Sequence, residues 1–71
     1  MIDHHEIETR FTYHAPKEGQ AEKYQAIRDD AKKLAALVVL ITPESREQAL
    51  ALTKIEEAVF WANAAIARRG V

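Results

Sequence analysis

The sequence predicts an all-α protein in which a short N-terminal helix and an extended segment precede two long antiparallel helices. Two observations carry this prediction. Apolar residues recur at spacings of three and four, the signature of amphipathic helices, through two long stretches of the chain. A link of four residues, 42–45, which contains a proline, separates these stretches. With 71 residues, the chain is expected to form one helical-hairpin domain spanning residues 1–71.

The first element is expected at the N-terminus. Asp3 and Glu6 fit a D-x-x-E capping box, in which the first side chain accepts from the backbone of the helix it begins. A short helix is therefore predicted to begin at Asp3 and to end near Arg10.

The following segment, residues 11–16, is predicted to be extended. Pro16 biases the residue before it away from the helical region. Because side chains alternate along an extended chain, Phe11 and Tyr13 are expected to project to the same side. These aromatic residues either pack on the helical hairpin or offer a platform on which a base can stack.

The first long helix is predicted over residues 20–41, because Gly19 is the last break and neither Gly nor Pro occurs in this range. Its apolar stripe comprises Ala21, Tyr24, Ile27, Ala31, Leu34, Val38 and Ile41. Arg28 and Lys32 follow Tyr24 at i+4 and i+8, along one side of the helix. They form either a solvated charged face or a set of cations directed at phosphates.

The second long helix follows the link and is expected to run to about Arg69, with Gly70 after it. Its N-cap is either Thr42 or Ser45, and Ser45 forms an S-x-x-Q capping box with Gln48. So short a link makes the two long helices antiparallel neighbours.

This second helix carries more apolar surface than one partner helix can cover. Its expected core stripe comprises Leu52, Ile55, Val59, Ala62 and Ile66. Phe60 and Trp61 lie off that stripe, and Asn63 is the only polar residue in the range 58–67. We expect Phe60 and Trp61 to be buried between subunits of a homo-oligomer. Asn63 either fixes the register of that oligomer or faces a polar ligand.

Composition limits the ways in which so short a chain can be stabilised. A single core in so short a chain rarely supplies more than about 3–5 kcal/mol. The chain has no cysteine, and its three histidines are clustered near the N-terminus, so neither disulfides nor a zinc centre is expected. Association with further copies is the remaining source of stability.

Several function classes are disfavoured. The net charge of −1 argues against binding to polymeric DNA or RNA. No apolar run approaches the length of about 20 residues that spans a bilayer, and the N-terminus lacks a signal peptide, so a cytoplasmic protein is expected. No nucleophile is placed beside a base, so no enzymatic activity and no cofactor are expected.

Four segments of the sequence resemble the phage anti-CBASS sponge family, the Acb2-like helical hairpins. They are R-F-T-Y-H-x-P at 10–16, Y-x-x-I-R at 24–28, P-x-S-R-E at 43–47 and L-A-L-T-x-x-E-E-A-x-x-W-A-N-A-A-I-A-R at 50–68. The resemblance implies a homohexamer in the infected bacterial host cell. It also implies that cyclic dinucleotides such as cyclic GMP-AMP are bound without being cleaved, so that the host effector is deprived of its signal.

The same resemblance implies roles for individual residues. Tyr13 would stack on a base, with Phe11 beside it, and Arg28 or Lys32 would contact phosphate. A separate site for cyclic trinucleotides would use Asn63 and Arg68, which lie about 140° apart on one helix and would converge from neighbouring subunits. Alternatively, Arg68 is present only because a cation near a helix C-terminus interacts favourably with the helix dipole.

Two other functions are considered beside this one. The chain could be an oligomeric adaptor or regulatory protein that binds another protein. It could also be a sponge for a cyclic ADP-ribose-type signal.

Overall fold

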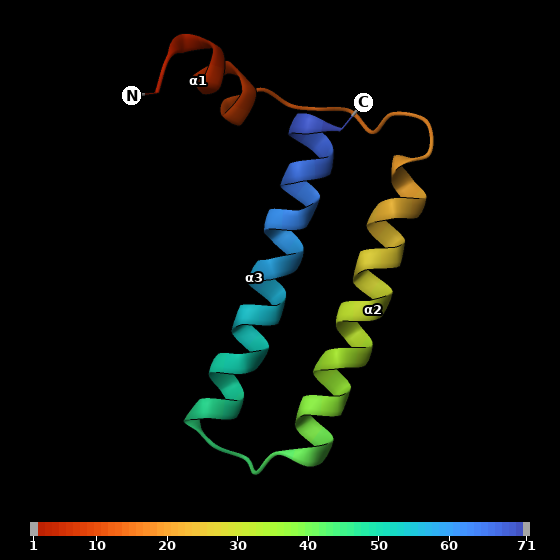
Figure 1. The fold of residues 1–71 in the computed structure, drawn as a ribbon, viewed down its shortest axis with the longest axis vertical. Coiled ribbons are helices and arrows are strands. Elements are labelled where there is room, and N and C mark those ends of the chain that lie inside the picture. Colours follow the sequence, from red (N-terminus) through yellow and green to blue (C-terminus); the bar gives the residue numbers. More distant parts are fainter. Residues whose placement is uncertain (1, 71) are drawn as a thin grey trace.

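The computed structural model describes residues 2–70 and has three helices, with no strand in that range. They are α1 (His4–Phe11), α2 (Gln20–Ile41) and α3 (Arg46–Arg69). Figure 1 shows α2 and α3 side by side and antiparallel, with α1 beyond the open end of this hairpin. The all-α fold class with its helical hairpin is therefore confirmed. The two end residues of the predicted 1–71 domain, 1 and 71, lie outside the described residues.

Helix α1 begins as predicted and ends one residue later than predicted. The Asp3 carboxylate caps it by accepting a hydrogen bond of 2.9 Å from the Glu6 backbone N–H. Phe11 is its last residue, and the extended backbone begins at Thr12. The prediction that Phe11 shares one side of an extended segment with Tyr13 is therefore wrong. The conformational bias of Pro16 acts on the residue directly before it and leaves Phe11 free to complete the helix.

The hairpin buries one face of each long helix only partly. All five residues of the predicted α3 stripe are half-buried. On α2 the half-buried positions are Tyr24, Ile27, Ala31, Ala35 and Val38. Ala21, Leu34 and Ile41 were predicted to lie in the stripe but are exposed. A single partner helix contacts only a narrow line of side chains, so residues at the edge of the apolar stripe stay uncovered.

The structure of the link between the long helices shows which of Thr42 and Ser45 is the N-cap of α3. Ser45 caps α3, because its Oγ accepts a 3.1 Å hydrogen bond from the Gln48 backbone N–H. The Gln48 side chain does not complete the capping box. Its Nε2 instead donates to the Thr42 carbonyl, at 3.1 Å, at the C-terminal end of α2. Gln48 thus ties the start of α3 to the end of α2.

The single chain has no closed core among residues 2–70. No hydrophobic residue within residues 2–70 is buried, and Phe60 and Trp61 are 63% and 64% exposed. The chain exposes 5939 Å², whereas a compact monomer of its 8.0 kDa mass exposes about 4,450 Å². Its radius of gyration is 15.4 Å, compared with about 11 Å for a compact domain of this length. A large apolar surface therefore remains without a partner in the isolated subunit.

None of the helices within residues 2–70 is both long enough and apolar enough to cross a lipid bilayer.

Candidate functional site

The open end of the hairpin carries a hollow of about 550 Å³, here called the open-end hollow. Its walls come from three parts of the chain: the end of α1 with the strap, which we define as residues 12–19; the first turns of α2; and the last turns of α3. Figure 1 shows how the chain between α1 and α2 passes the C-terminal end of α3. The lining residues with polar or aromatic side chains include Arg10, Tyr13, Tyr24, Arg28, Phe60, Asn63 and Arg68.

Charge is unevenly distributed at this hollow. Arg10, Arg28 and Arg68 line it, and none of the residues that line it is an aspartate or a glutamate. The whole chain, by contrast, has a net charge of −1. Arg10 is paired with the Glu6 carboxylate outside the lining, but the remaining two arginines at this concave surface generate a local positive potential that favours a small anion.

Two of these arginines are available for an anionic ligand. Within residues 2–70, neither Arg28 nor Arg68 forms a salt bridge. Arg28 donates to the amide oxygen of Gln25 at 3.2 Å, and Arg68 donates to the Arg10 carbonyl at 3.5 Å. Both contacts are with neutral acceptors. A guanidinium would form stronger, charge-assisted hydrogen bonds with phosphate.

Tyr13 is presented to solvent at the rim of the hollow. Its side chain is 83% exposed. His14, the next residue, is half-buried, and its Nε2 lies 2.7 Å from the Thr9 carbonyl oxygen. Because side chains alternate along extended backbone, holding His14 inward directs Tyr13 outward. The exposed ring is free to stack on a flat partner.

Asn63 is half-buried, and its Oδ1 is shielded from solvent with no hydrogen-bond partner within residues 2–70. An acceptor buried without a donor costs about 1–3 kcal/mol. A donor from a ligand or from another subunit would remove that cost. Arg68 lines the same hollow although it lies about 140° around α3 from Asn63. Its long side chain turns back toward α1, which it contacts at the Arg10 carbonyl.

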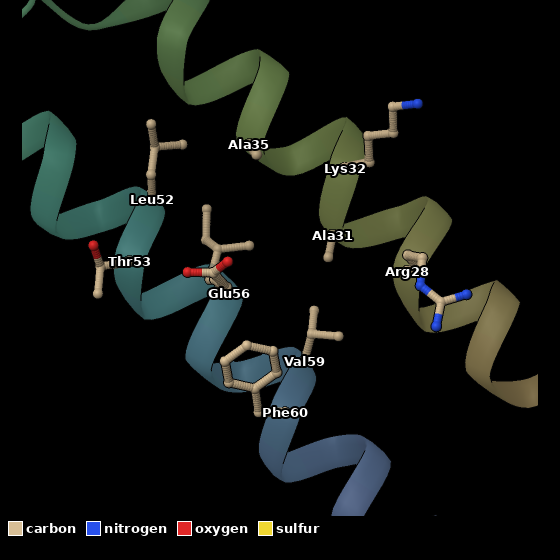
Figure 2. A pocket seen from close by; sticks show the side chains of 10 residues that line it. Arg28, Ala31, Lys32, Ala35, Leu52, Thr53, Glu56, Val59 and Phe60 are labelled. Atoms are coloured by element: carbon tan, nitrogen blue, oxygen red, sulfur yellow. The ribbon is translucent and has the colours of Figure 1, made fainter.

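A second hollow, of about 420 Å³, lies between α2 and α3 further from the open end. Arg28 and Phe60 line both hollows, whereas Lys32 and Glu56 line only this second one. Figure 2 shows the Lys32 side chain pointing away from α3. Of the two candidate phosphate contacts, Arg28 is therefore the one that lines the open-end hollow together with Tyr13, and Lys32 lies one helical turn further along.

The structure thus brings together four of the six predicted site residues. Tyr13, Arg28, Asn63 and Arg68 line the open-end hollow of one subunit. Phe11, the last residue of α1, is 83% exposed and lines neither hollow. Within residues 2–70, no group of three metal-ligating side chains gathers.

Sequence reasoning missed Arg10 and assigned Phe60 only to a subunit interface. Arg10 reaches the hollow because α1 is held against the end of α3. Both carboxylate oxygens of Glu6 accept hydrogen bonds of 2.8 Å from Arg69, and Arg10 lies 3.1 Å from the same carboxylate. Residues 6 and 69 are far apart in the sequence, so no local pattern could have indicated this contact.

This cluster lowers the pKa of the Glu6 carboxyl below its ordinary value of 4.5, chiefly through the hydrogen bond from Arg69 and then through Arg10. A carboxyl with a lowered pKa in the folded state stabilises the fold at pH values above its unfolded pKa. That contribution is lost as the pH falls through the lower, folded-state pKa.

We therefore expect α1 to loosen from α3 as the pH falls below about 4.5. The Glu6→Gln variant should be loosened already at neutral pH and should lack this acid transition. NMR chemical shifts of the α1 amides, followed through an acid titration, measure both effects. Glu8→Gln is the matched control, since within residues 2–70 the only hydrogen bond of the Glu8 carboxylate comes from the nearby Thr12 hydroxyl. An unchanged acid transition in Glu6→Gln would contradict the assignment of this transition to the Glu6 carboxyl.

A comparison with protein-family models matches the hairpin domain described as Acb2/Tad1 over residues 3–67. The chain belongs to the Acb2/Tad1 hairpin family. The Acb2/Tad1 match spans α1, α2 and nearly all of α3, so it includes every residue that lines the open-end hollow except Arg68. It confirms the resemblance to the anti-CBASS sponge family noted from the sequence segments. Searches of curated proteins and of solved structures found no match.

Proposed function

We propose that this Acb2/Tad1 hairpin protein is a phage anti-defence sponge that binds cyclic oligonucleotide signals without cleaving them. By withholding the messenger, it would block CBASS signalling in the cytoplasm of the infected bacterial cell. The observation that supports this most directly is the open-end hollow, in which an exposed tyrosine stands beside arginines with no carboxylate. The proposed ligands are cyclic dinucleotides such as cyclic GMP-AMP.

The chemistry of the hollow suits both parts of such a ligand. The ring of Tyr13 would stack on a base, an interaction that contributes about 1–3 kcal/mol for each base. Arg28 would bind phosphate through paired N–H groups, for which the planar guanidinium is well shaped. Phe11 and Lys32 lie outside the open-end hollow in one subunit, so any contact they make would be at its edge or from a neighbouring copy.

Assembly would double these contacts. A cyclic dinucleotide has near-twofold symmetry, and an isologous interface presents every residue twice. Two copies of Tyr13 could then enclose two bases, while two copies of Arg28 meet two phosphates. We propose a homohexamer, in which the exposed apolar surface around Phe60 and Trp61 is covered by other subunits. No excess of positive charge over the whole chain is needed, because assembly concentrates the few cations of each copy.

Asn63 and Arg68, which also line the open-end hollow, are proposed to bind cyclic trinucleotides at a separate site to which neighbouring subunits each contribute a copy. The Asn63 Oδ1 atom lacks a donor within the described chain, and an exocyclic amine of a base would supply one. Three copies around a threefold axis would match the symmetry of a cyclic trinucleotide.

One alternative ligand fits the same observations. A cyclic ADP-ribose derivative also carries a base and phosphates, so an aromatic side chain beside arginines would suit it. An adaptor that binds another protein is favoured by a different feature, the large exposed apolar surface. Direct binding of a small ligand distinguishes both sponge functions from the adaptor.

Isothermal titration with 3′,3′-cyclic GMP-AMP, with a cyclic tri-adenylate and with cyclic ADP-ribose tests the proposal. We expect tight binding of the dinucleotide, and its recovery in unmodified form after the protein is denatured. The stoichiometry reports whether each ligand is shared by two subunits or by three. Binding of cyclic ADP-ribose alone would support the alternative sponge, and no heat with any ligand would favour the adaptor.

Substitution of Arg28 and of Lys32 tests which of these two candidate residues of α2 meets phosphate. Arg28→Gln is expected to weaken binding of cyclic GMP-AMP by roughly 10- to 150-fold, because a hydrogen bond to a charged group contributes about 1.5–3 kcal/mol. Lys32→Gln is the matched control and should change the affinity less than about fivefold, because an exposed charge pair contributes about 0.2–1 kcal/mol. Titration calorimetry measures the affinity of both variants. A larger loss of affinity in Lys32→Gln than in Arg28→Gln would assign the phosphate contact to Lys32 instead.

A further inference from the structure

The strap has no regular secondary structure of its own between α1 and α2. It nevertheless carries Tyr13, the residue that the proposed function places on a base. Apart from the contact of His14 with the Thr9 carbonyl, its position is set by contacts at its two ends. Both ends are attached to the same place, the last turn of α3.

The far end of the strap is held by Gln20. Among residues 2–70, Gln20 alone is buried, with 3% of its surface exposed. Its Oε1 accepts a 2.8 Å hydrogen bond from the Lys17 backbone N–H, and its Nε2 donates to the Ile66 carbonyl at 3.2 Å. One buried side chain thus connects the strap, the first residue of α2 and a C-terminal carbonyl of α3. That carbonyl also accepts a 2.9 Å hydrogen bond from the Gly70 backbone N–H, so Gln20 is the second donor to an oxygen with two lone pairs.

Gly70 leaves the space that this contact needs. Its backbone has φ −69° and ψ 140°, a conformation that any residue adopts. A Cβ at this position, however, would overlap the Ile66 carbonyl and would lie 2.8 Å from the Gln20 Nε2. Glycine is therefore required for close approach rather than for backbone freedom. The Gly70 carbonyl also accepts from the Lys17 ammonium at 3.3 Å.

The near end of the strap is held by α1. Arg69 bonds both carboxylate oxygens of Glu6, and Arg68 reaches the Arg10 carbonyl. These contacts are exposed, so salt screens them. The buried Gln20 contact is the stronger of the two attachments, because a buried amide cannot exchange its partners for water.

We infer that Gln20 and Gly70 are positioning residues, which fix the strap against the last turn of α3 and so hold Tyr13 at the rim of the open-end hollow. This inference rests on the proposed function, since it assigns Tyr13 to the ligand. Neither residue needs to touch the ligand. Their effect on binding passes through Tyr13.

A double-mutant cycle distinguishes positioning from general support of the fold. Gln20→Leu keeps a similar volume and removes both hydrogen bonds. It should weaken binding of 3′,3′-cyclic GMP-AMP roughly tenfold in the otherwise native chain. In the Tyr13→Ala background the same substitution should change the affinity less than about twofold, because the residue that it positions is absent. Gly70→Ala should reproduce this pattern with the Gln20 side chain intact.

Amide hydrogen exchange of the ligand-free protein supplies a second readout. Gln20→Leu and Gly70→Ala should each speed exchange at the Lys17 amide, whose acceptor is the Gln20 side chain. Gln48→Leu is the matched control, because it removes another glutamine that donates to a helix C-terminal carbonyl, at the opposite end of the hairpin. It should leave both the strap exchange and the affinity unchanged.

The outcomes separate the inference from the function on which it rests. If the native protein binds the dinucleotide and the affinity losses from Gln20→Leu and Tyr13→Ala are additive, positioning is wrong while the proposed function stands. Unchanged exchange at Lys17 in both Gln20→Leu and Gly70→Ala would also overturn the inference. If the native protein binds no cyclic nucleotide, the proposed function fails, and the role of Gln20 in ligand binding fails with it.

Discussion

Replacing Tyr13 with alanine is expected to abolish most of the affinity for cyclic GMP-AMP while leaving the oligomer intact. Tyr13 is 83% exposed, so its removal opens no cavity in the subunit. Stacking on one base contributes about 1–3 kcal/mol, which corresponds to roughly 5- to 150-fold in affinity. In a twofold site two copies are lost together, and the losses multiply. Titration calorimetry, with light scattering to measure the mass of the oligomer, tests both parts.

Phe11→Ala is the matched control for this experiment. Phe11 has the same exposed fraction as Tyr13 but ends α1 and lines neither hollow. We expect its loss to reduce the affinity much less than the loss of Tyr13. Unchanged affinity in Tyr13→Ala would remove this residue from the site. An equal loss in both variants would show that Phe11 also meets the ligand, as the family resemblance implies.

The Trp61→Asp variant is expected to dissociate the assembly. Trp61 is 64% exposed in the isolated subunit, beside Phe60 and in the most apolar part of α3. Burying a large apolar side chain stabilises an interface by about 1.5–3 kcal/mol, and burying an unpaired carboxylate there costs considerably more. Because no hydrophobic residue within residues 2–70 is buried in the single chain, loss of the proposed assembly should also lower the helix content.

Sedimentation at several protein concentrations, together with circular dichroism, measures this effect. The native chain should sediment as six copies of 8.0 kDa, and Trp61→Asp as a much smaller species. Lys33→Asp is the control, since it introduces the same carboxylate at an exposed polar position of α2. A native chain that sediments as a monomer would contradict the proposed hexamer. A Trp61→Asp variant of native mass would place the interface on another face.

Local patterns in the sequence determined the helices, because the forces that begin and end a helix act within a few residues. The Asp3 cap, the range of α2 and the end of α3 all follow from side chains within one helical turn. The same is true of the α3 stripe, since its period depends only on helical geometry. The end of α1 was misplaced by one residue because a proline five positions away exerts no control there.

The grouping of the site was decided by the tertiary structure. Tyr13, Arg28 and Asn63 come from three segments, and their meeting at one hollow depends on how the strap crosses the end of α3. The same packing placed Arg28 rather than Lys32 beside Tyr13, left Phe11 outside and added Arg10. Contacts such as Glu6 with Arg69 and Gln20 with Ile66 join residues more than forty positions apart. A one-dimensional pattern records only neighbours along the chain, so contacts of this kind become visible only when the chain is folded.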